Sequence, residues 1–487
     1  MEKINHPTHL PAGRKELMFS LPLLICGMML YNFTINGGLQ LGFALAMFAY
    51  LLWATEYLLI SGCKLTPYSG CLLGLSLVII AGYGRSADSF VKFILLFPLV
   101  LSINLGFCLL AGQHRHSPGG AGSIADVFHS IFSLGFGELG NAIGGLFNTA
   151  TKQSTAFKKL GAVGLGLLVM IPVLAILLPL MIQSDAAFEG MMELFPEIEI
   201  TEIIFTLLMG TAVFCVLYSR CVALVHCHKE EPVPSGNRKG IHKLTVNTVL
   251  IGVGGVYCLY LVSQLAYFVG GFSGILPQEY TLAEYARRGF FEMAILCGLN
   301  MGIVVLAVAL VRKSGSRTPL STRLLCLFIG LFTLFLVAAS SAKMINYING
   351  YGLTRLRLMT QLIIVFFGIA AITVSANLFM KKPRYMPVLI IAALVIGGTT
   401  LWADVDTVVA AYNVNAYQTG KLATVDVEYL GTLSNGAIPH IAKLTQDKNP
   451  EVAKQAQKIL KYQYTGCEDF RSWNYADFRA KEFIPNK

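Results

Sequence analysis

The chain has 487 residues, of which 55% are hydrophobic and 13% are charged, and its mean hydropathy is +0.63. Soluble domains carry about a quarter charged residues, so this composition excludes an ordinary soluble protein and indicates lipid as the main solvent. The net charge of +10 is unevenly placed, because residues 404–487 contain ten acidic and ten basic side chains. The positive excess therefore belongs to the apolar part of the chain and its loops.

Apolar runs occur at the length that a membrane-crossing helix requires, which is about 20 residues. The first run lacks a small-residue cleavage site, so we expect a retained span and not a removed signal peptide. The third and eleventh runs are short. The sequence predicts an all-α protein, with a transmembrane helix bundle in residues 1–402 and about eleven spans: 17–33, 38–60, 68–84, 90–111, 160–183, 201–226, 244–271, 289–311, 323–343, 358–380 and 386–402.

Basic residues indicate the orientation of these spans, because lysine and arginine are enriched in cytoplasmic loops. With the N-terminus in the cytoplasm, alternate loops hold most of the lysines and arginines, and the loop from Asp185 to Glu202 on the opposite side is acidic. An odd number of spans then places the C-terminus outside the cytoplasm. We expect a multi-pass protein of the cytoplasmic membrane, with the lipid bilayer as its main partner.

Residues 124–148 differ from a span, because apolar residues recur at helical spacing on one face only. The other face holds Asp126, His129, Ser130, Glu138 and Asn141. This pattern predicts an interfacial helix on the cytoplasmic side. It suits equally well a coupling helix that packs under the bundle.

Residues 403–487 are predicted to form a small helical domain outside the cytoplasm. Asn449 precedes Pro450 and Glu451, which is typical of an N-cap, a first helical position and an acidic first turn. Ser434 is expected to cap a second helix at residues 437–444. Such a pair resembles a HEAT-type unit, and because one unit cannot bury its own apolar face, we expect it to pack on other helices.

Paired arginines stand in two loops that the orientation places outside the cytoplasm, against the usual charge bias. Arg287 and Arg288 precede the eighth span, and Arg355 and Arg357 precede the tenth. The planar guanidinium suits phosphate or carboxylate, so these four are the predicted substrate-binding residues for an anionic ligand. The alternative is that they reach lipid headgroups or pair with carboxylates of the tail.

Ionisable residues near these loops are the candidates for acid–base chemistry. Glu292 and Asp406 are the candidate catalytic groups, and Glu292 with Lys343 fits a salt-bridge network better than a reaction. The histidines around 115 and 227 lack partner pairs at metal-site spacing, and two acids as close as Asp404 and Asp406 are common by chance. No nucleotide-binding fingerprint is present. We therefore expect no metal, no cofactor and no nucleic-acid partner.

Several motifs, in order along the chain, resemble a bacterial membrane family catalogued as domain of unknown function 4153/4173. The resemblance covers roughly residues 245–487 and implies a polytopic architecture with a polar tail and no particular activity. Ala411 stands where family members often have arginine, and Gly436 where an acid is usual. The matching stretches are 284–292, Tyr351 to Arg355, Asp406, Tyr412-Asn413, Asp426, Tyr429-Leu430, Leu433-Ser434, Ala437, 470–474 and Ala480.

Three functions fit these observations. The first is transport or flipping of an anionic or lipid-linked molecule at the arginine loops, with the tail as a lid. The second is a membrane-embedded transferase of the cell envelope, in which Glu292 or Asp406 acts as a base. The third is a non-catalytic sensor or assembly partner that binds a membrane or envelope protein through its tail.

Overall fold

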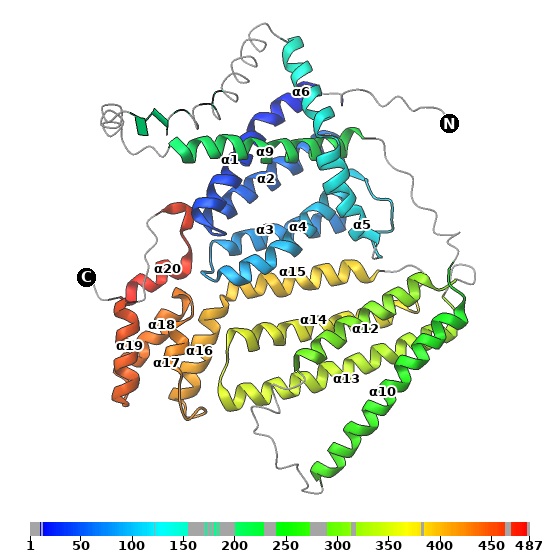
Figure 1. The fold of residues 1–487 in the computed structure, drawn as a ribbon, viewed down its shortest axis with the longest axis vertical. Coiled ribbons are helices and arrows are strands. Elements are labelled where there is room, and N and C mark those ends of the chain that lie inside the picture. Colours follow the sequence, from blue (N-terminus) through cyan, green and yellow to red (C-terminus); the bar gives the residue numbers. More distant parts are fainter. Residues whose placement is uncertain are drawn as a thin grey trace. The chain divides into compact units, whose positions relative to one another are not determined.

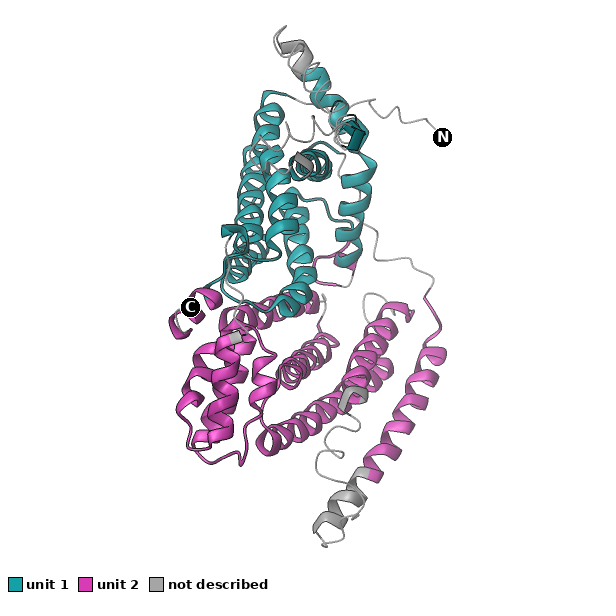
Figure 2. Ribbon diagram, turned by 60° about the vertical axis from the view of Figure 1, so that its left-hand side comes forward, with its two compact units in different colours: residues 1–115, 124–231, 466–475 teal, residues 116–123, 232–465, 476–487 magenta. Residues whose placement is uncertain are grey.

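The computed structural model describes residues 10, 13–120, 122–153, 200–227, 240–272, 290–312, 318–380, 384–462 and 469–484, with scattered residues between 170 and 184. Within these ranges the chain is helical and has no β-strand; Ile241 and Val311 form an isolated bridge. The chain divides by its contacts into two units, which Figure 2 colours separately.

Unit 1 comprises residues 1–115, 124–231 and 466–475. In it α1 packs on α2 and α9, α3 packs on α2 and α4, and η1 and α6 pack on α9 (Figure 1). Its described helices are α1 (Arg14–Gly37), α2 (Leu41–Ile60), α3 (Pro67–Tyr83), α4 (Ser89–Ala111), α5 (Gly122–His129, whose first residues belong to unit 2), η1 (Ser130–Gly137), α6 (Leu139–Gln153), α9 (Ile200–His226) and η4 (Phe470–Ser472).

Unit 2 comprises residues 116–123, 232–465 and 476–487. Four long helices, α10, α12, α13 and α14, enclose its apolar core, and α15 packs on α14. The described helices are α10 (Lys243–Phe272), α12 (Phe290–Leu310), α13 (Leu320–Tyr351), α14 (Arg355–Asn377), α15 (Tyr385–Ala403), α16 (Val405–Gln418), α17 (Val427–Gly431), η2 (Asn435–Ala437), α18 (Ile438–Ile441), η3 (Ala442–Gln446), α19 (Pro450–Tyr462), α20 (Tyr475–Ala480) and η5 (Lys481–Phe483).

The long helices coincide with the predicted spans. Nine of the described helices are long and apolar enough to cross a membrane, and the 17-residue α3 matches the short third run. The fifth run, residues 160–183, lies largely outside the described residues. The structure therefore confirms an all-α polytopic helix bundle, while the count of eleven stays a prediction.

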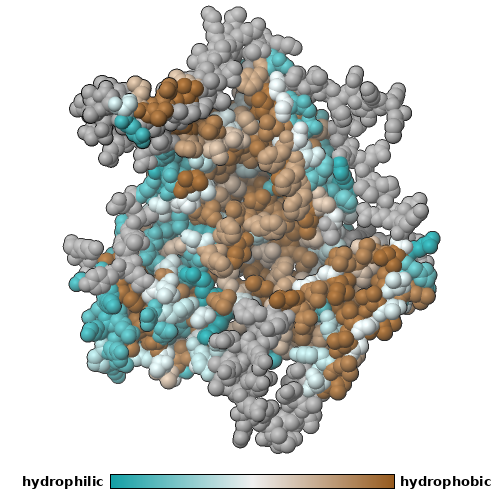
Figure 3. All heavy atoms as spheres, viewed as in Figure 1, coloured by the Kyte–Doolittle hydropathy of each residue, from teal (hydrophilic) through white to brown (hydrophobic). Residues whose placement is uncertain are grey.

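Apolar side chains remain on the surface of these helices, as lipid contact requires. Leu259 of α10 is 72% exposed and Ile295 of α12 is 70% exposed. Figure 3 shows brown, hydrophobic atoms over the long helices of unit 2 and teal, hydrophilic atoms over its tail helices α17 to α19. The tail is thus a polar part of unit 2, whereas the long helices present an apolar surface.

The segment from α5 to α6 packs on α9, which corresponds to the second of its two predicted arrangements. Asp126 and Ser130, assigned to the polar face, are 4% and 1% exposed, whereas Phe128 and Phe132 are 47% and 60% exposed. The polar side chains therefore point into the unit and the aromatic ones away from it. Between α5 and α6 the eight residues of η1 form a π-helix, a rare geometry that often occurs at functional sites.

The predicted tail contains short helices whose ends are defined by side chains. Asn449 caps α19 as expected, since its side-chain oxygen accepts a hydrogen bond from the Glu451 amide at 3.0 Å. The predicted Ser434 cap is wrong, because its hydroxyl forms no capping hydrogen bond. Ile438, Leu460 and Ala480 form a small core that joins α18, α19 and α20. The tail packs as predicted, except that residues 469–475 belong to unit 1.

Candidate functional site

The turn between α13 and α14 creates the first part of the site. α13 ends at Tyr351, and Gly352 follows with φ +77°, a left-handed conformation that favours glycine. The Thr354 hydroxyl accepts a hydrogen bond from the Arg357 amide and so caps α14. Arg355 is consequently the first residue of α14, where its side chain can reach the tail.

Arg355 and Asp406 form a bidentate ion pair. Arg355 Nε lies 2.9 Å from Asp406 Oδ1, and Nη2 lies 2.5 Å from Oδ2. The Ser434 amide also donates to Oδ2, at 2.8 Å. The Asp406 side chain is fully buried, whereas that of Arg355 is 31% exposed. Three donors on one buried carboxylate explain how the site accommodates a charge that burial alone would make unfavourable.

Two more tail residues hold the same turn. Asn413 of α16 accepts a hydrogen bond from the Leu353 amide at 2.7 Å and donates one to the Leu353 carbonyl at 2.6 Å. The Tyr429 hydroxyl accepts a hydrogen bond from the Arg355 amide at 2.8 Å. Burial raises the pKa of Tyr429, so this hydroxyl stays protonated at neutral pH. The tail is therefore fastened to the start of α14 by backbone and side-chain bonds together; we call Arg355, Asp406, Asn413 and Tyr429 the latch.

Arg357 has a different environment from Arg355. Its guanidinium donates to the Tyr351 carbonyl at 3.0 Å and to the Gly352 carbonyl, and it lies 3.9 Å from the centre of the Tyr347 ring. Arginine here satisfies carbonyls at the end of α13 while stacking on an aromatic ring. The structure thus places Arg355, Arg357 and Asp406 in one neighbourhood of unit 2.

The structure does not describe the side chains of three predicted site residues. Arg287 and Arg288 lie outside the described residues. Glu292 lies in the first turn of α12, and its side chain is outside the description. Asp406, the other candidate base, has three donors on its carboxylate and no exposed surface, which leaves it poorly placed to accept a substrate proton.

Gly436 stands where the resembling family usually has an acid, and its surroundings explain the departure. A Cβ at this position would lie 2.0 Å from Asp404 Oδ2 and 2.7 Å from the Thr407 hydroxyl oxygen. That hydroxyl donates to Asp404 Oδ2 at 2.6 Å and lies 3.0 Å from the Gly436 carbonyl. The Asp404 carboxylate therefore occupies the space that a side chain at 436 would need.

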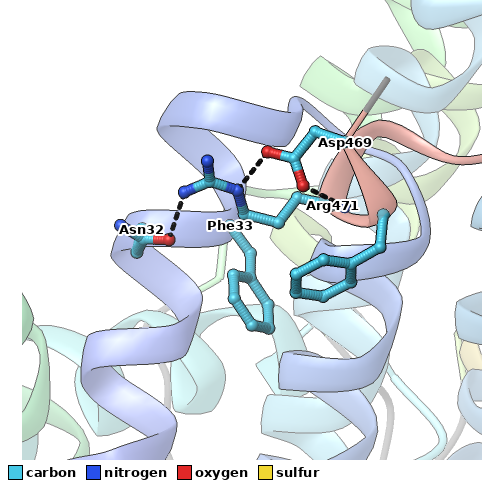
Figure 4. A pocket seen from close by; sticks show the side chains of 5 residues that line it. Asn32, Phe33, Asp469 and Arg471 are labelled. Carbon is cyan, nitrogen blue, oxygen red and sulfur yellow. Dashed lines mark hydrogen bonds and ion pairs between the residues drawn. The ribbon is translucent and has the colours of Figure 1, made fainter. Parts of the chain in front are cut away.

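A second polar cluster lies in unit 1, where residues 469–475 of the tail cross α1 and α2; we call this segment the strap. Arg471 Nη1 donates to Asn32 Oδ1 at 2.9 Å and to Glu202 Oε1 at 2.8 Å, and Nε donates to Asp469. Figure 4 shows the Arg471 guanidinium between Asn32 and Asp469. The rings of Phe33 and Phe470 pack edge to face, with their centres 5.6 Å apart. These residues line a shallow pocket of about 630 Å³.

The charged side chains of the strap form ion pairs: Arg471 pairs with Asp469 of the strap and with Glu202 of α9. The Arg471 backbone amide and guanidinium hold the pKa of Asp469 below its usual value. Hydrogen bonds to Glu202 and then Asp469 raise the pKa of Arg471. Close approach requires glycine, because a Cβ at Gly37 would lie 2.6 Å from the Arg471 carbonyl. The arrangement is an anchored segment and offers no free cation to a ligand.

The sequence analysis missed a third feature, Arg220. An arginine inside the predicted span 201–226 could have identified it, because a charged residue within a span is a candidate functional residue. Arg220 is 4% exposed. Its guanidinium donates to the Ser130 hydroxyl, the Tyr50 hydroxyl and the Asn104 backbone carbonyl, each at 3.4 Å, and lies 5.5 Å from the Phe107 ring centre. No carboxylate among the described residues forms an ion pair with it.

The π-helix lies against this arginine. Ser130, its first residue, supplies one acceptor, and the neighbouring Ser219 hydroxyl donates to the Leu134 carbonyl within the π-helix at 3.3 Å. Four separate elements, α2, α4, η1 and α9, therefore contribute to a buried polar cluster around one cation. Arg220, Tyr50, Ser130 and Asn104 are called the Arg220 cluster below.

Two of the described histidines have protein partners. His226 Nε2 lies 3.0 Å from Glu16 Oε1, and His129 Nε2 lies 3.0 Å from an Arg115 nitrogen. Burial, and then the charge of Arg115, lower the pKa of His129. The described residues contain no group of three His, Cys, Asp or Glu side chains with the arrangement of a metal site.

Comparison with known proteins shows one match. Neither curated proteins nor solved structures match the chain. A family described as "Domain of unknown function (DUF4153)" matches residues 38–444. The match includes the first half of the chain, which the motif resemblance left out, and it stops before the strap. Because it covers most of the sequence, including Arg220 and the latch, the chain belongs to the DUF4153 family.

Proposed function

We propose that this protein transports or flips an anionic or lipid-linked molecule, and that Arg220 is its substrate contact within the bundle. The supporting observation is a buried arginine whose described acceptors are all neutral and all at 3.4 Å. An ionised side chain inside a membrane bundle is costly to bury, and such residues commonly mark substrate or ion pathways.

The geometry favours Arg220 over Arg355 and Arg357, two of the four arginines that the sequence suggested. The Arg355 charge is matched by Asp406, and Arg357 is engaged by carbonyls and a ring. A guanidinium has five N–H donors, and an incoming phosphate or carboxylate would form shorter, charge-assisted bonds with it than the neutral acceptors do. A negatively charged substrate therefore complements the Arg220 cluster.

Movement of a fluorescent lipid in proteoliposomes tests this proposal. Purified protein is reconstituted with a dye-labelled phosphatidylglycerol, and a membrane-impermeant reductant measures the fraction of label that changes leaflet. We expect the wild-type protein to move the labelled lipid. The rate of movement should fall at least about tenfold in Arg220→Gln, because a tenfold change corresponds to the free energy of one charge-assisted contact. Lys454→Gln, at an exposed lysine of α19, is the matched control. Equal movement in Arg220→Gln, with folding confirmed by gel filtration, would exclude Arg220 as the contact.

A second function is favoured by a different observation, the docking of the tail through the latch. A tail held by a buried ion pair suits a non-catalytic sensor or assembly partner, because a tail in a fixed position can present one surface to a partner protein or a signal. Purification under mild conditions tests it: a stoichiometric partner that is lost in Asp406→Asn supports this role, whereas a wild-type protein that purifies alone speaks against it.

A further inference from the structure

A pocket of about 390 Å³ lies in the tail and shares no lining residue with the latch or the Arg220 cluster. Its walls come from two parts of the sequence, the helices α18 and η3 and the segment of α20 and η5. The lining side chains that matter here are His440, Lys443, Thr445, Gln446, Arg479 and Phe483.

The pocket has a positive lining. Lys443 and Arg479 are exposed cations from two separate segments of the lining, and the charges of both act on the imidazole of His440. Glu482 lies 3.9 Å from Arg479, and both side chains are about half exposed, so this surface pair contributes little in water. The lining itself contains these two cations and no carboxylate, so it favours anions.

The two sides of the pocket share an apolar core. Ile438 and Ala480 are buried in it together with Leu460, and Ala442 of η3 packs against it. Packing of both segments on one core places the cations near each other before any ligand binds. Phe483 is 37% exposed and adds an aromatic surface beside them.

We propose that this pocket binds the phosphate group of a small organic molecule, with Lys443 and Arg479 contacting the phosphate and Phe483 contacting the organic part. Gln446 supplies an amide for a further hydrogen bond at the pocket edge, whereas the Thr445 hydroxyl donates to the Ala442 carbonyl at 2.8 Å. A volume of about 390 Å³ falls in the range of small-ligand sites and accommodates a phosphate with a ring or a short chain. The site is separate from the proposed transport contact, since it shares no residue with it.

His440 predicts how binding depends on pH. Burial, followed by the charges of Lys443 and Arg479, lowers the pKa of His440, so the imidazole is neutral at pH 7 in the free protein. A bound phosphate offsets those two cations and favours the protonated imidazole. Binding therefore takes up a proton at His440, and this pH dependence, measured as the difference from His440→Gln, opposes the loss of affinity that protonation of the phosphate itself causes between pH 7 and 5.5.

Titration calorimetry of the full-length protein in nanodiscs tests the site, with phenyl phosphate as the probe. We expect saturable binding that weakens at least about tenfold in Lys443→Gln and in Arg479→Gln, because each removes one charge-assisted contact. Lys454→Gln, a lysine on α19 outside the pocket, should bind as the wild type does. His440→Gln should bind but lose this contribution to the pH dependence. Wild-type affinity in both pocket variants, or no binding by the wild type, would overturn the proposal.

The lipid of the nanodisc distinguishes the two sources of such a phosphate. If phenyl phosphate binds more weakly in discs that contain phosphatidylglycerol than in discs of phosphatidylcholine alone, the lipid competes for the site and the ligand is a lipid headgroup. If it does not compete, the ligand is a soluble phosphorylated molecule. Calorimetry of Lys443→Gln and Arg479→Gln reports on the pocket, whereas lipid movement by Arg220→Gln reports on transport, so a failure of the transport proposal and a failure of this one are separately visible.

Discussion

Arg355 Nη2 and Asp406 Oδ2 lie 2.5 Å apart although the two residues are 51 positions apart in the chain. The pair connects the first residue of α14 to the first turn of α16, so it joins a long apolar helix to the polar tail. Because Asp406 is fully buried, loss of Arg355 leaves a buried carboxylate with the Ser434 amide as its one remaining donor of the three described above.

The first prediction concerns that pair. Arg355→Met is expected to destabilise unit 2 by about 3–5 kcal/mol, the usual cost of an unpaired buried charge, whereas Arg355→Met with Asp406→Leu should recover much of the loss. Thermal unfolding in detergent and the rate of proteolysis within the tail measure both. If the double variant is no more stable than the single one, the pair is not the main fastening of the tail.

A second prediction tests the turn before α14. Gly352→Ala forces a side chain into a left-handed φ and places its Cβ 2.6 Å from Asn413 Oδ1. Gly420 is the matched control, because its φ is +74° and a Cβ there meets nothing within 4 Å. Gly420→Ala should cost about 1 kcal/mol from backbone strain alone, and Gly352→Ala should cost more. Comparable unfolding temperatures for the two variants would show that contact with Asn413 is unimportant.

The third prediction concerns Gly436 and Asp404. Gly436→Ala should destabilise the tail, since its Cβ collides with the Asp404 carboxylate. Asp404→Gly should relieve that collision, so Gly436→Asp in the Asp404→Gly background should be better tolerated than Gly436→Asp alone. The unfolding temperatures of the wild type, Gly436→Asp, Asp404→Gly and the double variant provide the coupling energy between the two positions. Additive effects would indicate that the two positions do not share one space.

The fourth prediction concerns the pH dependence of the strap. The pKa of Asp469 is lowered in the folded protein, so its ionised form stabilises the strap at all pH values above its ordinary pKa of about 4. That contribution is lost as the pH falls from about 4 through the folded pKa. Photo-cross-linking to α1 by a benzophenone, coupled to a cysteine at position 472 before acidification, should therefore decline in acid.

Asp469→Asn provides the control for the strap, because it removes the titrating group while keeping a hydrogen-bond acceptor. It should cross-link less than the wild type at pH 7 and show a weaker change between pH 5 and pH 3. A wild-type strap that is insensitive to acid would show that the Glu202 and Asn32 contacts of Arg471 suffice.

Much of the fold followed from local patterns. The positions of α1 to α4, α9, α10 and α12 to α15 were predictable because a helix must hold about 20 apolar residues to cross lipid, and that requirement is readable in a linear sequence. The start of α19 was predictable because a cap is also a local feature: Asn449 and Pro450 act within one turn. The Ser434 cap was predicted wrongly, because Ser434 contacts Asp406 of another helix through its backbone amide and forms no cap with its hydroxyl.

The partners of the charged residues were decided by the tertiary structure alone. The sequence placed Arg355 and Asp406 on one side of the membrane, but whether an arginine faces a ligand or a carboxylate depends on how α14 and α16 pack. Arg471 and Glu202 are 269 residues apart, and Arg220 meets Tyr50 across 170. Hydropathy and helical caps are properties of neighbouring residues, whereas the pairing of charges depends on distances of a few ångströms that only the folded chain establishes.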